Sequence, residues 1–196
     1  MIILGITGGS GCGKTTVSDF FREKGIDVID TDKTARIIVE PGRPALSEIK
    51  DYFGNEYINP DGTLNRKKMA NLVFSHPDKL EILNKITHKY ITQYVRSYIS
   101  GYNGNIIGID GAALIESGIG SVCDCILSVL SDRQIRIKRI MMRDNLNENE
   151  AKCRISAQKD DTFYIENSDY LVYNNNSIID LHKQLENILK DLRSKL

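Results

Sequence analysis

Residues 2–17, IILGITGGSGCGKTTV, join a short apolar run to a glycine-rich loop. Within them, Gly8–Thr15 fits the pattern GxxxxGK followed by Ser or Thr, whose four fixed positions arise by chance in well under about 1% of chains of this length. Ile2–Ile6 suits a strand buried on both faces of a parallel sheet, and Thr15–Lys24 has the length of a helix. This order of strand, loop and helix predicts a phosphate-binding loop. A glycine-rich turn with a solvated lysine is the alternative.

The residue types of the loop explain how it would bind a nucleotide. Glycines allow backbone angles that turn successive N–H groups inward, and the following helix adds the positive end of its dipole. Lys14 would neutralise oxygens of the β- and γ-phosphates of ATP, and Thr15 would offer its hydroxyl to a Mg²⁺ cofactor. The residues expected around the phosphates are Gly9, Ser10, Gly11, Cys12, Gly13, Lys14, Thr15 and Thr16.

Composition limits the possible partners. The chain has 196 residues, enough for one α/β domain with an insertion, and its 26 Lys and Arg balance its 26 Asp and Glu. We therefore expect no nucleic-acid or membrane partner. No apolar run approaches a signal peptide or the roughly 20 residues of a membrane span, so we expect a cytoplasmic protein. The four cysteines form no CxxC pair and are expected to be reduced thiols.

Later apolar segments alternate with helical patterns, as in βαβ folds. The predicted strands are Ile26–Ile29, Asn105–Asp110, Cys125–Ser131 and Tyr170–Tyr173. Asn147 and Glu150 resemble a capping box that opens a helix through about Lys159, and Ile178–Leu192 has the spacing of a closing helix. The fold class is therefore α/β, a five-stranded parallel sheet flanked by helices.

The segment 33–104 contains no convincing strand but has apolar positions spaced for several helices, with an Asp-Gly turn at 61–62. It is interpreted as a helical substrate-binding insertion. The nucleotide-binding core would then comprise 1–32 and 105–196, with a lid near 132–160.

Acidic residues follow two of the predicted strands. Asp30 and Asp32 come after the second strand, at the edge where ligands bind in open α/β sheets, and would share one side if the strand continued. Either carboxylate could accept a proton from an attacking hydroxyl, or could only cap the next helix. Asp110 ends the third strand, where an acid can hold Mg²⁺, although capping is again the alternative. Glu116 could be a further site group or a surface charge.

A helix predicted after the fourth strand is rich in arginine. Arg139 and Arg143 lie four residues apart on one face. Guanidinium groups on a mobile helix would stabilise the transferring charge and exclude water. A charge run is more often a solvated helix face.

Together these segments resemble the dephospho-CoA kinase family over nearly the whole chain. The resemblance rests on Gly5–Val17 with its Thr-Gly-Gly start, on Asp30–Arg36, on Glu40–Leu46, Phe53-Gly54 and Asp61–Arg66, and on Asp132–Arg139 and Arg154–Gln158. It implies ATP-dependent phosphorylation of the ribose 3′-hydroxyl of dephospho-CoA, giving CoA and ADP.

The resemblance also implies roles for single residues. Asp32 would be the catalytic base, Lys14 and Thr15 would hold the phosphates and Mg²⁺, and Arg139 would be a lid arginine. Thr7 would lie beside the acceptor hydroxyl. The remaining assignments are Arg66, His88 and Glu116 for the acceptor, Arg143 and Asn174 for ATP, and Asp110 for the metal.

Three segments depart from the family pattern. His88-Lys89 replaces His-Pro, and Ala112–Glu116 replaces Pro-Leu-Leu-x-Glu while keeping the acid. Asn174–Asn176 replaces Asn-x-Gly, where Asn would be tolerated at positive φ.

Another P-loop small-molecule or nucleotide kinase is one alternative function, and a catalytically silent nucleotide-binding regulator is another. Either a monomer or a small homo-oligomer is compatible with the sequence.

Overall fold

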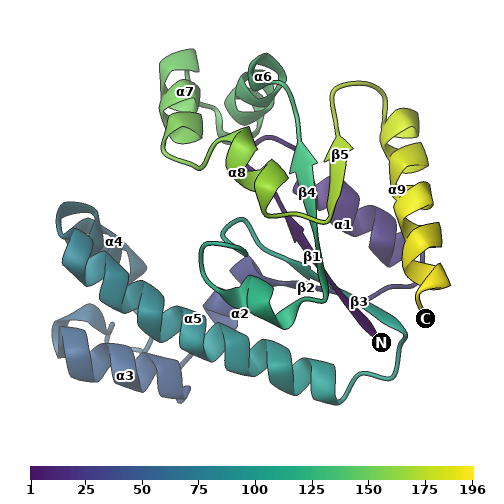
Figure 1. Cartoon of the computed structure of the whole chain (residues 1–196). Helices are drawn as coiled ribbons and strands as arrows, with labels where there is room; N and C mark the ends of the chain where they lie inside the picture. The colour runs from purple at the N-terminus through teal and green to yellow at the C-terminus, as the bar shows by residue number, and fades with distance from the viewer. The chain divides into compact units, whose positions relative to one another are not determined.

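The computed structural model describes residues 1–196 and contains a five-stranded sheet (Figure 1). The strands are β1 (Ile2–Thr7), β2 (Val28–Asp30), β3 (Ile106–Asp110), β4 (Cys125–Leu130) and β5 (Tyr170–Tyr173). Their order is β2-β3-β1-β4-β5, and β1 pairs in parallel with both β3 and β4. This confirms the predicted α/β fold and puts the carboxyl end of β1, where the glycine loop begins, at the centre of the sheet.

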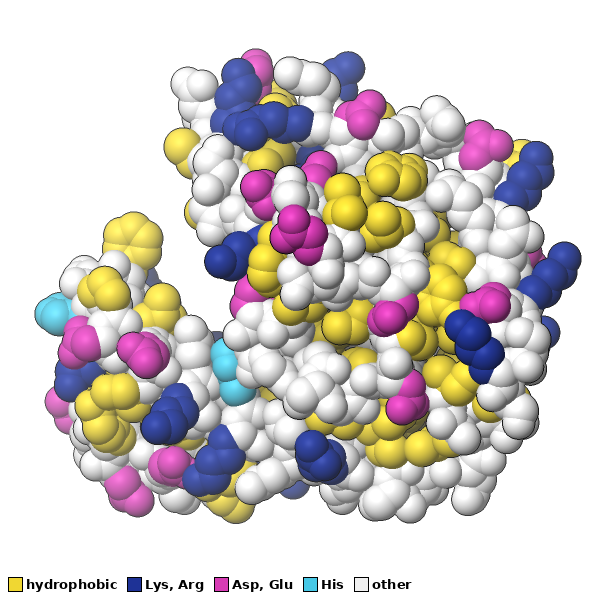
Figure 2. Space-filling model, in the orientation of Figure 1, with side chains coloured by type: hydrophobic (Ala, Val, Ile, Leu, Met, Phe, Trp, Pro, Cys, Tyr) yellow, Lys and Arg dark blue, Asp and Glu magenta, His cyan; other side chains and the backbone are white.

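By its contacts the chain divides into two compact units. The sheet unit comprises Met1–Ile29, Asn103–Glu116 and Gly120–Leu196, and the helical unit comprises Asp30–Tyr102 and Ser117–Ile119. Figure 2 shows Lys and Arg side chains interspersed with Asp and Glu over the visible face. No helix is long and apolar enough to cross a membrane.

Two helices cover one face of the sheet. Helix α1 (Lys14–Glu23) packs on β1 and β3, and α9 (Ile178–Ser194) packs on β5 and on α1. The main core forms between these helices and the alternate strand residues Leu4 and Ile6. Because side chains alternate along a strand, Gly5 faces the opposite side, where a Cβ would lie 2.6 Å from the Leu114 side chain. The glycine lets the segment after β3 pack directly on the strand.

Along the chain, three helices lie between β4 and β5: α6 (Arg133–Asp144), α7 (Glu148–Ser156) and α8 (Asp161–Glu166). Ile137 and Ile140 of α6 pack with apolar residues of α7 in a small core of their own. The capping box predicted at Asn147 is present. However, α7 ends at Ser156 rather than near Lys159, because Asp160 accepts a hydrogen bond from Phe163 N (3.0 Å) and starts a new helix.

The second strand also begins later than predicted. Gly25 has φ +78°, and its N–H and that of Ile26 donate to carbonyls in the last turn of α1. Because the Ile26 N–H donates to a carbonyl of α1, it is not available for pairing in the sheet, and the strand starts at Val28 instead of Ile26.

The helical unit contains α2 (Thr31–Ile37), α3 (Pro44–Phe53), a 3₁₀ turn η1 (Asn55–Tyr57), α4 (Arg66–Ser75) and α5 (Pro77–Ser100). The long helix α5 contacts α2, α3 and α4. The Asp-Gly turn at 61–62 is present: Asp61 Oδ1 accepts from Thr63 N (3.0 Å), and an isolated antiparallel bridge joins Ile58 to Leu64. As predicted, segment 33–104 forms helices and no strand.

The core of the sheet unit predicts a measurable cost for losing a side chain from α9. Ile188 is 8% exposed, whereas Ile179 on the same helix is 63% exposed. We expect Ile188→Ala to lower the free energy of unfolding by about 2–5 kcal/mol, because it removes buried methyl groups and leaves a cavity. Ile179→Ala should change the free energy by no more than about 0.5 kcal/mol. Urea denaturation of the two variants measures the difference, and equal losses would contradict this packing.

Candidate active site

The glycine loop has the backbone that a phosphate cradle requires. Gly8, Gly11 and Gly13 have φ values of +141°, +79° and +97°, a region that other residues rarely adopt. At Gly8, a Cβ would also lie less than 3.0 Å from the Val129 carbonyl oxygen of β4. These positions therefore require glycine, and the loop leads from β1 directly into the N-terminus of α1.

Every loop carbonyl from Gly8 to Gly13 accepts a hydrogen bond. The donors are Lys14 Nζ to Gly8 (2.7 Å), Cys12 N to Gly9 (3.3 Å), Arg136 Nε to Ser10 (3.0 Å), Arg139 Nη1 to Gly11 (3.3 Å), Asn174 Nδ2 to Cys12 (2.9 Å) and Val17 N to Gly13 (3.3 Å). In a trans peptide the C=O and the following N–H point to opposite sides. Fixing the carbonyls therefore also fixes the directions of the loop N–H groups.

Two residues predicted for ATP binding lie on this loop. Besides bonding Gly11, Arg139 donates to Ser131 Oγ (3.3 Å) and to the Asn174 carbonyl (3.0 Å). Asn174 is buried and reaches Cys12 from the end of β5. The structure thus brings Arg139 and Asn174 together beside the loop, while their contact with a nucleotide stays a prediction.

None of the residues Asn174–Asn176 has a positive φ, so the tolerance of Asn for that conformation is not needed here. Asn145 is the one non-glycine residue of the chain with positive φ. Asn175 instead forms two hydrogen bonds with Asp132, accepting from its N–H (2.8 Å) and donating to its carboxylate (2.7 Å). These bonds join the end of β5 to the start of α6 in an ordinary backbone conformation.

Arg143 has a different set of partners from Arg139. It is 60% exposed, and its guanidinium donates to both carboxylate oxygens of Asp144 (2.9 and 2.8 Å). Asp144 also pairs with Arg154. The Arg143 hydrogen bonds keep the pKa of the Asp144 carboxyl below its usual value. No contact brings Arg143 to the loop, so its predicted role remains untested.

Two loop contacts come from residues that were not predicted as site residues. Arg136 is buried on α6, and Gln158 Oε1 accepts from Ser10 N (2.8 Å). Arg136 precedes Arg139 by three residues, so helical spacing put both on one face. Gln158 belongs to a segment that resembles the family, but nothing in the sequence indicated its contact with Ser10, which joins residues 148 positions apart.

Cys12 is fully buried within the loop. Burial raises the pKa of its thiol, although the Arg136 and Lys14 charges act in the opposite direction. The helix N-terminus therefore does not produce a reactive thiolate here. Cys12 is therefore a small space-filling residue of the loop.

The proposed metal ligands are oxygen atoms near the loop. Thr15 is exposed in the first turn of α1, and Asp110 Oδ2, at the end of β3, accepts from Ser18 Oγ of α1 (2.7 Å). The chain contains no cluster of three or more His, Cys, Asp or Glu residues that could hold a metal. Mg²⁺ is usually bound through one or two protein oxygens together with water and substrate phosphates. The donors present therefore fit Mg²⁺.

A cavity of about 510 Å³ opens next to the loop within the sheet unit. Its lining residues are Ala112, Ala113, Glu116, Ala157, Gln158, Lys159 and Tyr164. Gln158 connects it to the loop through Ser10, and burial raises the pKa of Tyr164 to about 12. Thr7 is buried, and its hydroxyl donates to the Ala112 carbonyl (3.4 Å). Glu116 thus faces an open volume, as a substrate-binding acid would.

The expectation that Asp30 and Asp32 share one side of a continuing strand is wrong, because the chain turns into α2 at Thr31. Asp30 is the N-cap of that helix: its Oδ1 accepts from Lys33 N (2.9 Å), and its carboxylate pairs with Lys33 Nζ (3.6 Å). Asp32 lies in the first turn of α2, exposed and without a hydrogen bond or ion pair. Of the two carboxylates, Asp32 is the one left available for chemistry.

The predicted acceptor residues of the helical unit lie on α4 and α5. Arg66 is exposed at the first position of α4. His88 is half-buried in α5, where burial lowers the pKa of its imidazole. Lys89, which stands where the family usually has proline, pairs with Glu48 of α3 (2.7 Å). The substitution therefore adds a link between α3 and α5.

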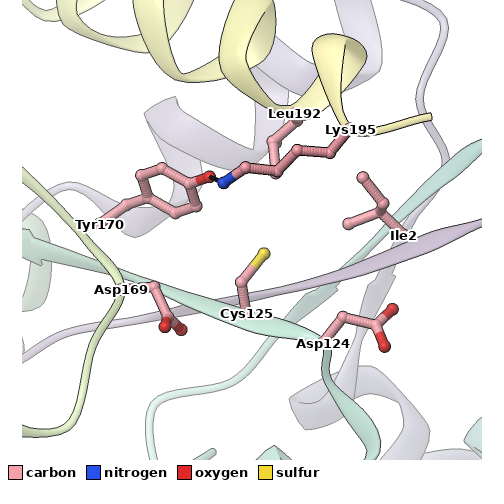
Figure 3. Close-up of a pocket in the computed structure, with 7 residues that line it drawn as sticks. All are labelled: Ile2, Asp124, Cys125, Asp169, Tyr170, Leu192 and Lys195. Carbon is pink, nitrogen blue, oxygen red and sulfur yellow. Dashed lines mark hydrogen bonds between the residues drawn. The ribbon is translucent and has the colours of Figure 1, made fainter.

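A second pocket, of about 450 Å³, lies at the opposite edge of the sheet, at the amino ends of β1, β4 and β5 (Figure 3). Its polar groups hold the fold together: Asp124 accepts from Ile3 N (2.7 Å), and Asp169 accepts from Ile126 N (2.8 Å). Burial is the main cause that raises the pKa of Cys125 to about 11, so this thiol stays neutral. The pocket offers no activated group.

Comparison with known proteins agrees with this geometry. The family model for dephospho-CoA kinases matches residues 2–180. The dephospho-CoA kinase of Lactobacillus johnsonii is 35% identical over 192 residues, covering 96% of this chain and 97% of that protein. The dephospho-CoA kinase of Saccharomyces cerevisiae is 36% identical over 207 residues, covering 100% of this chain and 85% of that protein. The crystal structure of TT1252 from Thermus thermophilus superposes with a TM-score of 0.84 at 29% identity, covering 97% of each chain. The chain belongs to the dephospho-CoA kinase family.

Proposed function

We propose that this chain transfers the γ-phosphoryl group of ATP to the ribose 3′-hydroxyl of dephospho-CoA, giving CoA and ADP. One observation carries this proposal: in a chain of this family, the glycine loop at the end of β1 has all its carbonyls from Gly8 to Gly13 engaged. Apart from the N–H groups of Ser10 and Cys12, which donate to Gln158 and Gly9, a loop fixed in this way can present its N–H groups and the N-terminus of α1 to a triphosphate.

The loop and the neighbouring strand end supply the phosphate and metal ligands. Lys14 releases its hydrogen bond to the Gly8 carbonyl and then neutralises the β- and γ-phosphates. The Thr15 hydroxyl and the Asp110 carboxylate hold Mg²⁺, which when bound offsets the charge on the phosphate oxygens. Ser18 orients Asp110 through its hydrogen bond, as groups behind metal ligands usually do.

Asp32 acts as the general base that receives the proton of the acceptor hydroxyl. Its carboxylate is free, whereas that of Asp30 is engaged in capping α2. Thr7 and Glu116 contribute to the acceptor side of the sheet unit, and Arg66 and His88 bind the acceptor from the helical unit. The chemical demand on the protein is mainly positioning, because phosphoryl transfer needs little covalent assistance.

Residues near 132–160 form a lid over the triphosphate, with Arg139 stabilising the charge of the transferring group. Arg139 already lies beside the loop through Gly11, and movement of the lid would place its guanidinium on a phosphate. Arg143 joins it after leaving Asp144.

The proposed reaction is tested by supplying ATP and Mg²⁺ with a panel of acceptors and measuring ADP release. We expect dephospho-CoA to be used, and shikimate and nucleosides not to be used. Lys14→Ala should lower kcat/KM by roughly 10²–10³, because a charge facing the phosphates is lost, without changing the melting temperature. Preference for another acceptor would show a different small-molecule kinase. Nucleotide binding without turnover of any acceptor would indicate a regulator.

The base is tested with Asp32→Asn, whose amide has the same shape as the carboxylate but cannot accept the proton. We expect kcat to fall by roughly 10²–10⁴ while ATP affinity and melting temperature change little. Asp30→Asn is the matched control, since Asn caps a helix about as well as Asp. If Asp30→Asn lost activity and Asp32→Asn kept it, the base would be Asp30.

The acceptor role of Arg66 predicts a selective effect on one substrate. We expect Arg66→Ala to raise the KM for dephospho-CoA roughly tenfold, as the loss of one charge-assisted hydrogen bond would. The KM for ATP should stay within about twofold. Lys67→Ala, the exposed neighbour on α4, controls for a general loss of charge. A rise in the ATP KM alone would place Arg66 at the other substrate.

A further inference from the structure

Arg136 combines features that surface arginines do not have. Its side chain is 4% exposed, and its Nη2 atom is buried without a hydrogen-bond partner. Its ion-pair partner Asp161 is 50% exposed and contacts only Nη1 (3.2 Å). Burying a cation with one donor unpaired is unfavourable for folding, so the position calls for a functional explanation.

The guanidinium holds one specific peptide of the phosphate loop. Nε donates to the Ser10 carbonyl (3.0 Å), while Gln158 accepts from Ser10 N (2.8 Å). Both backbone groups of Ser10 are therefore held by side chains from outside the loop. Because the peptide is trans, a Ser10 carbonyl directed at Arg136 turns the Gly11 N–H away from Arg136.

The loop is also shaped to accept this side chain. At Gly9, a Cβ would lie less than 3.0 Å from Arg136 Nη2. Gly9 is not among the glycines with positive φ, so its backbone would tolerate alanine. It is the guanidinium that occupies the space. At Gly11, a Cβ would meet the Arg136 carbonyl oxygen at 2.8 Å. Gly9 and Arg136 therefore form a complementary pair.

We propose that Arg136 is a positioning residue for phosphoryl transfer, which fixes the Ser10–Gly11 peptide so that the loop is ready for the triphosphate before it arrives. It acts through the loop backbone rather than by touching the reacting atoms. The inference rests on the proposed ATP site. A preorganised loop loses less entropy on binding, so removing Arg136 should weaken interactions with the phosphates specifically.

The first test compares Arg136→Met, which keeps an unbranched side chain of similar length, with Arg136→Lys and with Lys138→Met, an exposed control on the same helix. For Arg136→Met we expect kcat/KM for ATP to fall at least about tenfold and the Kd for ADP to rise, with the KM for dephospho-CoA within about twofold. Arg136→Lys should recover part of the loss. A lower melting temperature with unchanged ATP and ADP parameters would overturn the proposal. ADP binding is measured without an acceptor, so it reports on Arg136 even if the proposed acceptor is wrong.

The second test uses the contact between Gly9 and Arg136. Gly9→Ala should reproduce the ADP-binding defect of Arg136→Met, because the new methyl group displaces the guanidinium. In the double variant the two defects should not add, since the flexible Met side chain leaves room for the methyl group. Calorimetric ADP titrations of the four proteins complete the cycle. Fully additive losses of affinity would show that the two residues act independently, and would overturn the proposal.

Discussion

The hydrogen bonding of all six loop carbonyls from Gly8 to Gly13 is the interaction on which the candidate site depends. A glycine-rich loop has many accessible conformations, and its N–H groups form an anion site only when they point the same way. Three of the six donors are the side chains of Arg136, Arg139 and Asn174, each more than a hundred residues away from the loop in the sequence. The sheet brings them to the loop, and the loop in turn has the glycines that give them room.

Because of this arrangement, the phosphate loop reaches its fixed conformation only when the sheet unit has folded. Arg136 and Arg139 reach the loop because α6 follows β4, which pairs directly with β1. Asn174 reaches it because β5 pairs with β4. Strand pairing therefore sets the distances between the loop and its donors. Ser18 links α1 to Asp110 at the end of β3 in the same way, which ties the metal-binding edge to the same framework.

Local sequence patterns correctly predicted the features that depend on residues close together in the chain. The strand, loop and helix around Gly8–Thr15, the capping box at Asn147 and the turn after Asp61 are all present. For Asp30 the sequence left a strand position and a helix N-cap both open, because both suit Asp, and only the helix that follows decides for the cap. The contact of Gln158 with Ser10 could not be predicted, since side chains that meet through tertiary folding leave no periodic signal in one sequence. The acceptor contacts of Arg66, His88 and Glu116 remain predictions for the same reason.

Helix α9 has a consequence for how the protein forms during synthesis. It supplies Leu181, Leu185, Ile188, Leu189 and Leu192 to the core that also contains Leu4 and Ile6 of β1. Strand β1 is synthesised long before α9, and although α1 packs on it early, the core that they share is complete only when α9 has emerged. The helical unit, whose contacts join nearer neighbours, can complete its packing earlier. The nascent sheet unit thus keeps the part of its core that α9 covers exposed for most of translation, the interval in which chaperones bind such surfaces.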